Sequence, residues 1–257
     1  MKAAFKLSKW YLDCITDLGD ASIVYTGTAN WGPIRLHYSS LLENTAQLVT
    51  TRHSLRPQTE PSLDRCSLRW RSGALRMDGE WQADSAEIRE TVYASGAGSI
   101  EWRCFMPRAA VRINKRFGLG YVEHLNITIA PWKLPIRTLR WGRFATLSDW
   151  IVWIDWVGDF TRRVVYWNGE IAPASVLDDG QIEFLDGARL AMDRSLVLRQ
   201  GPLGGTALSI IPGVRDTFPA RLLEVNECKW RSRARLERPG RSTVEGWTIH
   251  ERVEWPK

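Results

Sequence analysis

Short runs of β-branched and aromatic residues, separated by turn residues, follow one another along the whole chain. In many runs apolar and polar positions alternate, which is the period of a strand with one buried face. Turn signals such as Gly32-Pro33, Asp78-Gly79 and Asn168-Gly169 lie between them. The pattern predicts strands over residues 20–28, 34–42, 66–70, 99–105, 121–130, 150–157, 162–168, 207–211, 227–236 and 247–255.

Little of the sequence has helical periodicity, and only residues 84–92 are predicted to form a short helix. Many short strands at this spacing are typical of a β-barrel or sandwich rather than of a βαβ fold. The sequence therefore predicts an all-β protein.

The two halves of the chain resemble each other in several short segments. Residues 101–104 (EWRC) match residues 229–232 (KWRS), and residues 120–124 (GYVEH) match residues 246–251 (GWTIHE). The matches keep the same order and a nearly constant offset, which indicates an internal duplication. Trp102 and Trp230 should then occupy matching positions in the two copies.

A natural boundary between the copies is residues 131–135, where two prolines favour an extended connector. The predicted domains are residues 1–130 and residues 131–257.

Tryptophan is unusually common, with 14 residues against 7 phenylalanines. A large ring with an N–H that needs a partner is a poor choice for filling a core. The excess indicates broad aromatic walls, such as the lining of a cavity.

The net charge of +6 comes largely from a C-terminal stretch in which Arg231, Arg233 and Arg235 alternate. Alternation places them on one face of a strand, and a solvated outer face is favoured over a nucleic-acid patch because no RNA-binding motif accompanies them.

No apolar run approaches the roughly 20 residues that cross a bilayer, and no secretion signal opens the chain. The widely spaced Cys14, Cys66, Cys104 and Cys228 are expected to be reduced thiols. These features predict a cytoplasmic protein, whose oligomeric state the sequence leaves open.

The segments Lys9-Trp10-Tyr11-Leu12-Asp13 and Arg35-Leu36-His37-Tyr38, with the closing Gly246-Trp247…Glu251, resemble the double-lipocalin superfamily. Carotenoid 1,2-hydratases, tocopherol-cyclase-like proteins and lipocalin-like Diels–Alderases belong to it. The resemblance implies two tandem lipocalin-like antiparallel β-barrel units packed together around a hydrophobic pocket. It also implies isoprenoid or polyketide substrates of secondary metabolism, and acid-assisted or pericyclic chemistry at carbon–carbon double bonds.

Such chemistry needs a carboxyl group whose pKa is raised by an apolar cavity. Strand periodicity places Asp155, Glu123, Glu251 and Asp13 on faces shared with apolar residues. Asp155 has the most desolvated setting, with no basic residue nearer along the chain than Arg162. We predict that Asp155 is unpaired, neutral and the general acid.

Structural roles remain open for all of these acids. Glu123 and Glu251 occupy equivalent places in the two copies, which favours a scaffold role with ion pairs to Arg103 and Arg231. Asp155 precedes Gly158-Asp159 and could simply cap that turn.

The predicted pocket lining comprises Trp153, Trp156, Tyr121, Trp141, Trp247 and Trp10. The histidines give little signal: His37 is expected to face water, and His124 and His250 to lie on outer faces. No pair of them has metal-ligand spacing, and no nucleotide-binding or nucleophile-elbow motif is present, so neither a metal nor a cofactor is predicted.

Two functions compete on this reading. One is a cofactor-independent hydratase, cyclase or isomerase, and the other is a carrier or sensor of an apolar ligand with the same pocket and no chemistry. A carbohydrate-binding module is disfavoured, because the tryptophans are interleaved with Val and Ile rather than set on a flat exposed face.

Overall fold

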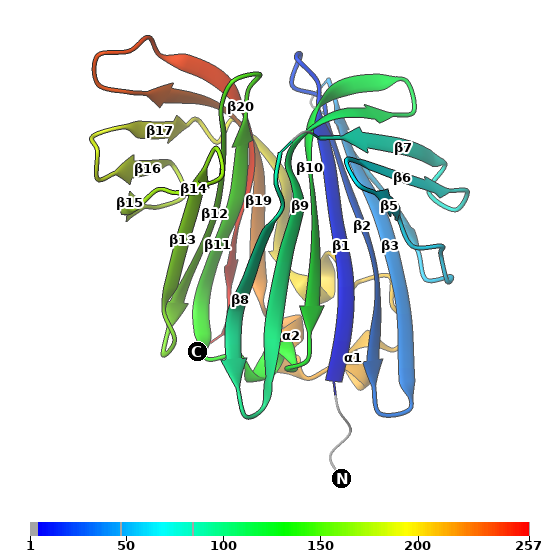
Figure 1. The fold of residues 1–257 in the computed structure, drawn as a ribbon. Coiled ribbons are helices and arrows are strands. Elements are labelled where there is room, and N and C mark those ends of the chain that lie inside the picture. The colour runs from blue at the N-terminus through cyan, green and yellow to red at the C-terminus, as the bar shows by residue number, and fades with distance from the viewer. Residues whose placement is uncertain (1–4, 47, 84, 257) are drawn as a thin grey trace. The chain divides into compact units, whose positions relative to one another are not determined.

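The computed structural model describes residues 5–46, 48–83 and 85–256, and strands dominate them (Figure 1). Strand accounts for 64% of the structure and helix for 6%, which confirms the predicted all-β class. The chain separates into two compact units, Met1–Lys133 and Leu134–Lys257, called unit 1 and unit 2 below.

The strands of unit 1 form one antiparallel sheet in the order β4-β3-β2-β1-β10-β9-β7-β6-β5, and β8 pairs with β9. A short 3-10 helix, η1 (Pro131–Lys133), ends the unit. The strands are β1 (Phe5–Ile15), β2 (Ala21–Trp31), β3 (Ile34–Thr45), β4 (Leu48–Ser54), β5 (Ser62–Asp64), β6 (Ser67–Ser72), β7 (Met77–Gln82), β8 (Ile88–Ser95), β9 (Gly98–Ile113) and β10 (Arg116–Ile127).

The strands of unit 2 form a second antiparallel sheet in the order β14-β13-β12-β11-β20-β19-β17-β16-β15, and β18 pairs with β19. They are β11 (Ile136–Ala145), β12 (Trp150–Gly158), β13 (Arg162–Trp167), β14 (Glu170–Ile171), β15 (Ala174–Leu177), β16 (Gln181–Phe184), β17 (Arg189–Met192), β18 (Leu196–Pro202), β19 (Asn226–Glu237) and β20 (Val244–Glu254). Between β18 and β19 lie η2 (Leu203–Gly205), α1 (Val214–Thr217) and α2 (Ala220–Leu223).

The two sheets have the same strand order when β11 is matched with β1, β12 with β2, and so on to β20 with β10. This correspondence supports an internal duplication. The turns that follow β1 and β11 give a common reference point. Thr16 and Thr146 each open their turn, with the amide of Thr16 bonded to the Asp20 carbonyl and that of Thr146 to the Asp149 carbonyl.

The expected match of Trp102 with Trp230 is wrong, because the two indoles face opposite sides of their sheets. Trp102 donates a hydrogen bond to Glu123 on the face away from the unit 1 core. Trp230 stacks on His250, which contacts the core residue Trp153 of unit 2. The pairing of β9 with β10 contains register irregularities, whereas the pairing of β19 with β20 is regular. The irregularities change the face of the sheet on which Trp102 lies.

Each unit has its own core on one face of its sheet, where every second residue of a strand points inward. In unit 1 the indole N–H of the fully buried Trp81 donates to the backbone carbonyl of Asp13 at 2.8 Å. The core of unit 1 includes Trp10, Leu12, Val24, Leu41, Trp70, Trp81, Met106 and Val122, and that of unit 2 includes Phe144, Ile151, Trp153, Val165, Ile182, Phe184, Leu190 and Leu236.

Three local predictions were wrong. Residues 88–95 form β8 instead of continuing a helix from 84, and residue 84 itself lies outside the described residues. The predicted strand over residues 207–211 is absent, because residues 206–210 form turns and residue 211 a bend. Residues 131–133 form η1 instead of an extended connector. The division between the units falls after Lys133, inside residues 131–135.

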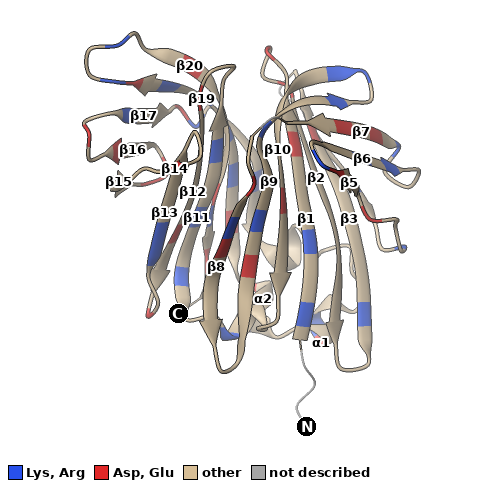
Figure 2. Ribbon diagram, in the orientation of Figure 1, with Lys and Arg blue, Asp and Glu red and all other residues tan. Residues whose placement is uncertain are grey.

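Charged residues lie mainly on the outer positions of the strands. The alternation predicted for β19 is present, since Arg233 and Arg235 are exposed while Ser232, Ala234 and Leu236 are buried. Figure 2 shows basic and acidic segments interspersed along both sheets. No helix among the described residues is long and apolar enough to span a membrane.

Counted from the two reference turns, Leu12 of unit 1 corresponds to Gly142, and its cross-strand neighbour Val24 corresponds to Trp153. A Cβ atom on Gly142 would lie 2.2 Å from Cζ2 of Trp153 and 2.6 Å from Cβ of His250. The duplicated cores therefore fill the same space in two ways, with two medium side chains in unit 1 and with glycine and tryptophan in unit 2.

The replacement of Leu12 and Val24 by Gly142 and Trp153, called the exchange here, predicts that Gly142→Ala destabilises the protein by about 1–3 kcal/mol through overpacking. The cost should shrink in a Trp153→Val background, because the indole that causes the clash is gone. Urea unfolding of the two single variants and the double variant measures the coupling. An equal cost of Gly142→Ala in both backgrounds would contradict the exchange.

Candidate functional site

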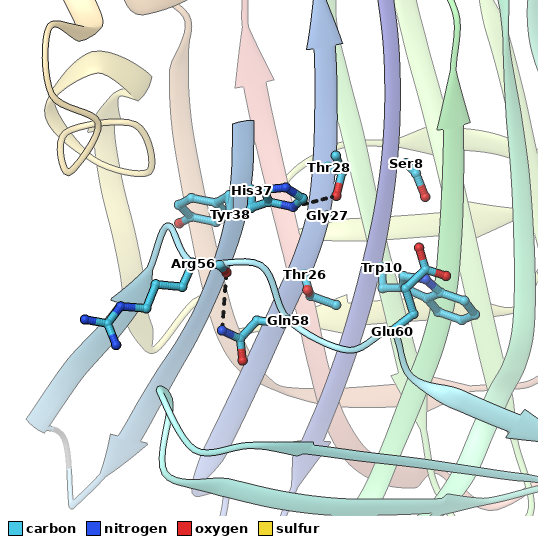
Figure 3. Close-up of a pocket in the computed structure, with 10 residues that line it drawn as sticks. All are labelled: Ser8, Trp10, Thr26, Gly27, Thr28, His37, Tyr38, Arg56, Gln58 and Glu60. Carbon is cyan, nitrogen blue, oxygen red and sulfur yellow. Dashed lines mark hydrogen bonds between the residues drawn. The ribbon is translucent and has the colours of Figure 1, made fainter. Parts of the chain in front are cut away.

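A small polar pocket lies on the inner side of the unit 1 sheet, between strands β1–β3 and the segment 55–61 that joins β4 to β5 (Figure 3). We call this segment the strap. The strap contributes charged and amide side chains, the strands contribute hydroxyl and imidazole groups, and the Trp10 side chain also lines the pocket. The lining residues are Ser8, Trp10, Thr26, Gly27, Thr28, His37, Tyr38, Arg56, Gln58 and Glu60.

Hydroxyl–imidazole hydrogen bonds gather at this pocket. Ser8 Oγ lies 2.8 Å from Nε2 of His124, and Thr28 Oγ1 lies 3.1 Å from Nδ1 of His37. Tyr38 alternates with His37 along β3, so its hydroxyl, which lies 3.2 Å from Nδ1 of His53, points away from these two pairs (Figure 3). Each pair can move a proton between an alcohol or phenol oxygen and a ring nitrogen near neutral pH.

Among these pairs, Ser8–His124 is the one set directly against the Trp10 ring. The His124 ring lies 4.7 Å from the ring of Trp10, and Trp10 stacks on Phe105 at 5.3 Å. Partial burial lowers the pKa of His124 below 6.5; Glu60 opposes this shift and Arg103 adds to it. His124 is therefore mainly neutral at pH 7 and can act as a base.

The strap is held in place by side chains of β6. Trp70 Nε1 donates to the Thr59 carbonyl at 2.7 Å, and Ser72 Oγ donates to Oε1 of Gln58 at 2.9 Å. With the strap in this position the pocket has a volume of about 20 Å3, enough for one water molecule. A larger ligand can enter only if the strap moves.

A wider groove of about 730 Å3 lies in unit 2, along the turns that follow β13, β16 and β19. Its buried carboxylate, Asp149, already accepts hydrogen bonds from Ser148, Trp167, Asn168 and Arg238. None of the predicted site residues lines this groove. We therefore regard the pocket of unit 1 as the candidate functional site.

The corresponding place in unit 2 is filled by ion pairs. Counted from the reference turns, Trp10 corresponds to Arg140, and its cross-strand neighbour Thr26 corresponds to Asp155. Arg140 lies 3.7 Å from Asp155 and 3.0 Å from Asp179, which also pairs with Arg252. One copy of the duplicated position thus keeps a pocket of hydroxyls and imidazoles, and the other carries a salt-bridge network.

The predicted setting of Asp155 is only half right. Its side chain is 1% exposed, as expected, but it is ion-paired rather than unpaired: Nε of Arg163 donates to its Oδ1 at 3.0 Å. Arg163 is the cross-strand neighbour of Asp155 in β13, and Arg140 is its neighbour in β11. An ion pair with two guanidinium groups is a poor setting for a neutral general acid.

Asp13 and Glu123 come together on the face of unit 1 opposite the pocket. Tyr11 donates to Asp13 at 3.0 Å, and Tyr121 donates to Glu123 at 2.6 Å. The strand register sets Tyr11 beside Glu123 and Asp13 beside Tyr121.

Trp102 supplies a further donor to Glu123 at 2.6 Å. Burial raises the pKa of the Tyr121 hydroxyl, and Cys104 and Glu123 raise it further, so Tyr121 remains a donor. Asp13 and Glu123 are 0% and 5% exposed. These donors satisfy the two buried carboxylates.

The remaining predicted residues are distributed over unit 2. Glu251 pairs with the buried Lys229, its cross-strand neighbour, and in unit 1 Arg103 pairs with Glu87. Three of the predicted tryptophans are buried and the fourth is half-buried. The buried ones are Trp141, whose ring faces the Lys229 ammonium, Trp153 in the core, and Trp156, which packs against Phe160. The half-buried one is Trp247, whose ring faces the Arg231 guanidinium.

Only Trp10 of the predicted lining lies in the pocket, and the histidines were undervalued. His37 lines the pocket instead of facing water, and His250 is buried against Trp230. A signal was available for one pair: Ser8 and His124 lie on the strands that open and close the first copy, which pair in a barrel. The contribution of the strap to the pocket could not be predicted from the sequence, since residues 55–61 have the composition of an ordinary loop.

Searches of sequence gave no match, either to a family model or to a curated protein. Solved structures did match. The strand order and the full-length similarity below establish the double-lipocalin fold, as the sequence resemblance predicted.

The crystal structure of CghA aligns with a TM-score of 0.58 at 11% identity, covering 98% of this chain and 88% of that one. Kievitone hydratase from Nectria haematococca aligns with a TM-score of 0.52 at 10% identity, covering 98% and 89%. A protein described as a putative AttH from Nitrosomonas europaea aligns at 0.52 and 8% identity, covering 97% and 92%. CghA has also been solved with Sch210972.

The ion pairs of Asp155 predict that Asp155→Asn destabilises unit 2 instead of acting only on chemistry. Removing the charge leaves Arg163 and Arg140 without their buried partner, at a cost of about 1–3 kcal/mol, lower than for a fully buried pair because both arginines are partly exposed. The midpoint of thermal unfolding should fall. An unchanged midpoint would show that the pair contributes nothing to stability.

The histidines should titrate very differently. Burial, with Lys229 and Arg194, lowers the pKa of His250 to about 3. Stability from this group is complete above pH 6.5 and is lost as pH falls towards 3, because only the unfolded chain takes up the proton. NMR of the ring nitrogens should show His250 neutral at pH 4.5. A protonated His250 at that pH would contradict the buried Ser232–His250 pair.

Proposed function

We propose that the protein binds an isoprenoid- or polyketide-like small molecule and catalyses hydration, cyclisation or isomerisation at a carbon–carbon double bond without a cofactor. The fold supports this at a coarse level, since a hydratase and a protein solved with a bound small molecule share it along most of their length. The pocket of unit 1 is the proposed site.

The observation that carries the proposal is the Ser8–His124 hydrogen bond set against Trp10. In the tautomer that leaves Nε2 free, His124 can take the Ser8 proton while Ser8 takes one from a water molecule or a substrate hydroxyl. The oxygen so activated attacks one carbon of the double bond. The imidazolium then returns the proton to the other carbon, so one imidazole serves as base and acid in turn.

The surrounding groups suit this sequence. Trp10 offers a broad ring against which an unsaturated chain can lie, and its π face can stabilise the positive charge of the His124 imidazolium, whose ring lies 4.7 Å away. The hydroxyls of Thr26 and Thr28 can orient the attacking oxygen. The role first assigned to Asp155 thus passes to His124.

The test uses a panel of prenylated phenols, linear polyenes and unsaturated polyketides, including kievitone, analysed by mass spectrometry. Hydration adds the mass of one water, and cyclisation or isomerisation changes the retention time at constant mass. For any compound turned over, His124→Gln should lower kcat/KM by about 10²- to 10⁴-fold, the range for loss of general acid–base catalysis. Ser8→Ala should lower it too, and the double variant should fall no further, since the pair acts as one unit.

His250→Gln is the control, because it removes a serine-bonded histidine that is buried in unit 2. Its turnover should match that of the native protein at a temperature where both are folded. Full activity of His124→Gln would remove the pocket of unit 1 from the mechanism.

A further inference from the structure

The indole N–H of Trp10 is a buried donor that has no hydrogen-bond acceptor among the described residues. Trp10 is 9% exposed and lines the pocket. Other buried tryptophans of unit 1 are satisfied: Trp70 donates to the Thr59 carbonyl, Trp81 to the Asp13 carbonyl and Trp102 to Glu123. Because buried donors are rarely left unpaired, the exception at the pocket calls for an explanation.

A second buried group beside the pocket also lacks an acceptor or donor among the described residues. The Ser39 hydroxyl is fully buried, and Ser39 is the cross-strand neighbour of the lining residue Thr26. Two unpartnered polar groups, together with the hydroxyl–imidazole pairs, make this pocket polar rather than hydrocarbon-like. A pure hydrocarbon placed here would leave the Trp10 N–H and the Ser39 hydroxyl without partners.

We infer that the pocket takes an α,β-unsaturated carbonyl compound, whose carbonyl oxygen accepts the hydrogen bond of Trp10 Nε1. This inference rests on the proposed function and names its substrate class. The carbonyl oxygen supplies the missing acceptor, and conjugation makes the distant carbon of the double bond electron-poor. A neutral base such as His124 is then sufficient, and no strong acid is needed to protonate an isolated alkene.

The atoms balance in such a reaction. Water forms a bond to the β-carbon through its oxygen, and the π electrons of the double bond move towards the carbonyl oxygen. The resulting enolate oxygen is stabilised by the Trp10 N–H, which acts as an oxyanion donor. The proton that water loses passes through Ser8 to Nε2 of His124 and then to the α-carbon, which completes a β-hydroxy ketone.

The ligand must displace the strap to reach Trp10. Figure 3 shows Glu60 of the strap next to Trp10, and Gln58 and Arg56 farther along the same segment. The strap has no strand partner and is tied to β6 by Trp70 and by the bond of Ser72 to Gln58. Loss of these few bonds is the cost of entry, and the new bond to Trp10 offsets part of it.

The experiment compares two probes of similar size, trans-chalcone, which is an enone, and trans-stilbene, which is a hydrocarbon. Binding is followed by tryptophan fluorescence and by the indole N–H signals of protein labelled with ¹⁵N at tryptophan. Chalcone should bind about tenfold more tightly than stilbene, the effect of one hydrogen bond, and should shift the Trp10 N–H signal downfield. Stilbene should leave that signal in place.

Trp10→Phe keeps an aromatic ring but removes the N–H, so it should abolish the preference for chalcone. Trp81→Phe is the matched control, because Trp81 is buried in the same core and its N–H already has an acceptor; this variant should keep the preference. If Trp10→Phe fails to fold, the shift of the Trp10 signal in the native protein decides. Equal binding of both probes with an unshifted Trp10 signal would overturn the inference.

The same samples separate this inference from the proposed function. Hydration of chalcone ends its conjugation and lowers its near-ultraviolet absorbance. Trp10-dependent binding without any absorbance loss would uphold the ligand class and count against catalysis. Turnover of a polyene that depends on His124, with no preference for the enone, would uphold catalysis and refute the ligand class.

Discussion

In each sheet the chain has to connect the strand at one edge directly to the strand at the opposite edge, and this constraint determines where a site can form. In unit 1, β4 and β5 are consecutive along the chain but lie at opposite ends of the sheet. The edge strands have unpaired backbone groups, and proteins commonly cover such edges with a loop, so the segment that connects the two edge strands is well placed to do this. Residues 55–61 make that connection in unit 1 and bring Arg56, Gln58 and Glu60 to the pocket. In unit 2, residues 172–173 make it directly, and no comparable strap lies over the inner face.

The duplicated positions beneath these connections have diverged in chemistry. Trp10 and Thr26 keep unit 1 uncharged at the place where Arg140 and Asp155 form ion pairs in unit 2. A buried ion pair contributes little net stability but is costly to break, so it fixes the inner face of unit 2 in one arrangement. Hydroxyl–imidazole pairs are weaker and can exchange protons. Unit 2 thus carries a network of ion pairs, and unit 1 carries the hydroxyl–imidazole pairs on which the proposed function rests.

The all-β class could be predicted from period and turn residues, because both are local properties of the sequence, and nine of the ten predicted segments coincide with strands. The other strands among the described residues, β1 and β11 included, were not predicted. The resemblance to the double-lipocalin superfamily came from residues 9–13, 35–38 and 246–251, and the fold agrees with it. The setting of Asp155 could not be predicted, since Arg163 and Arg140 reach it only across strands whose register the sequence does not reveal. The match of Trp102 with Trp230 failed because irregular pairing in β9 changes the face on which a side chain lies. The pocket itself depends on the strap, whose position is set by tertiary contacts with β6 that the local sequence does not reveal.

The central claim is that small molecules are bound on the inner face of unit 1 and not in the groove of unit 2. Photolabelling with benzophenone, an aromatic ketone that inserts into nearby C–H bonds, tests it most directly when the labelled peptides are mapped by mass spectrometry. The account predicts saturable labelling of the strap, residues 55–61, and of residues 8–10 and 26–28, with competition by chalcone. Labelling confined to residues 167–173, 184–188 or 238–241, which line the groove, would contradict it.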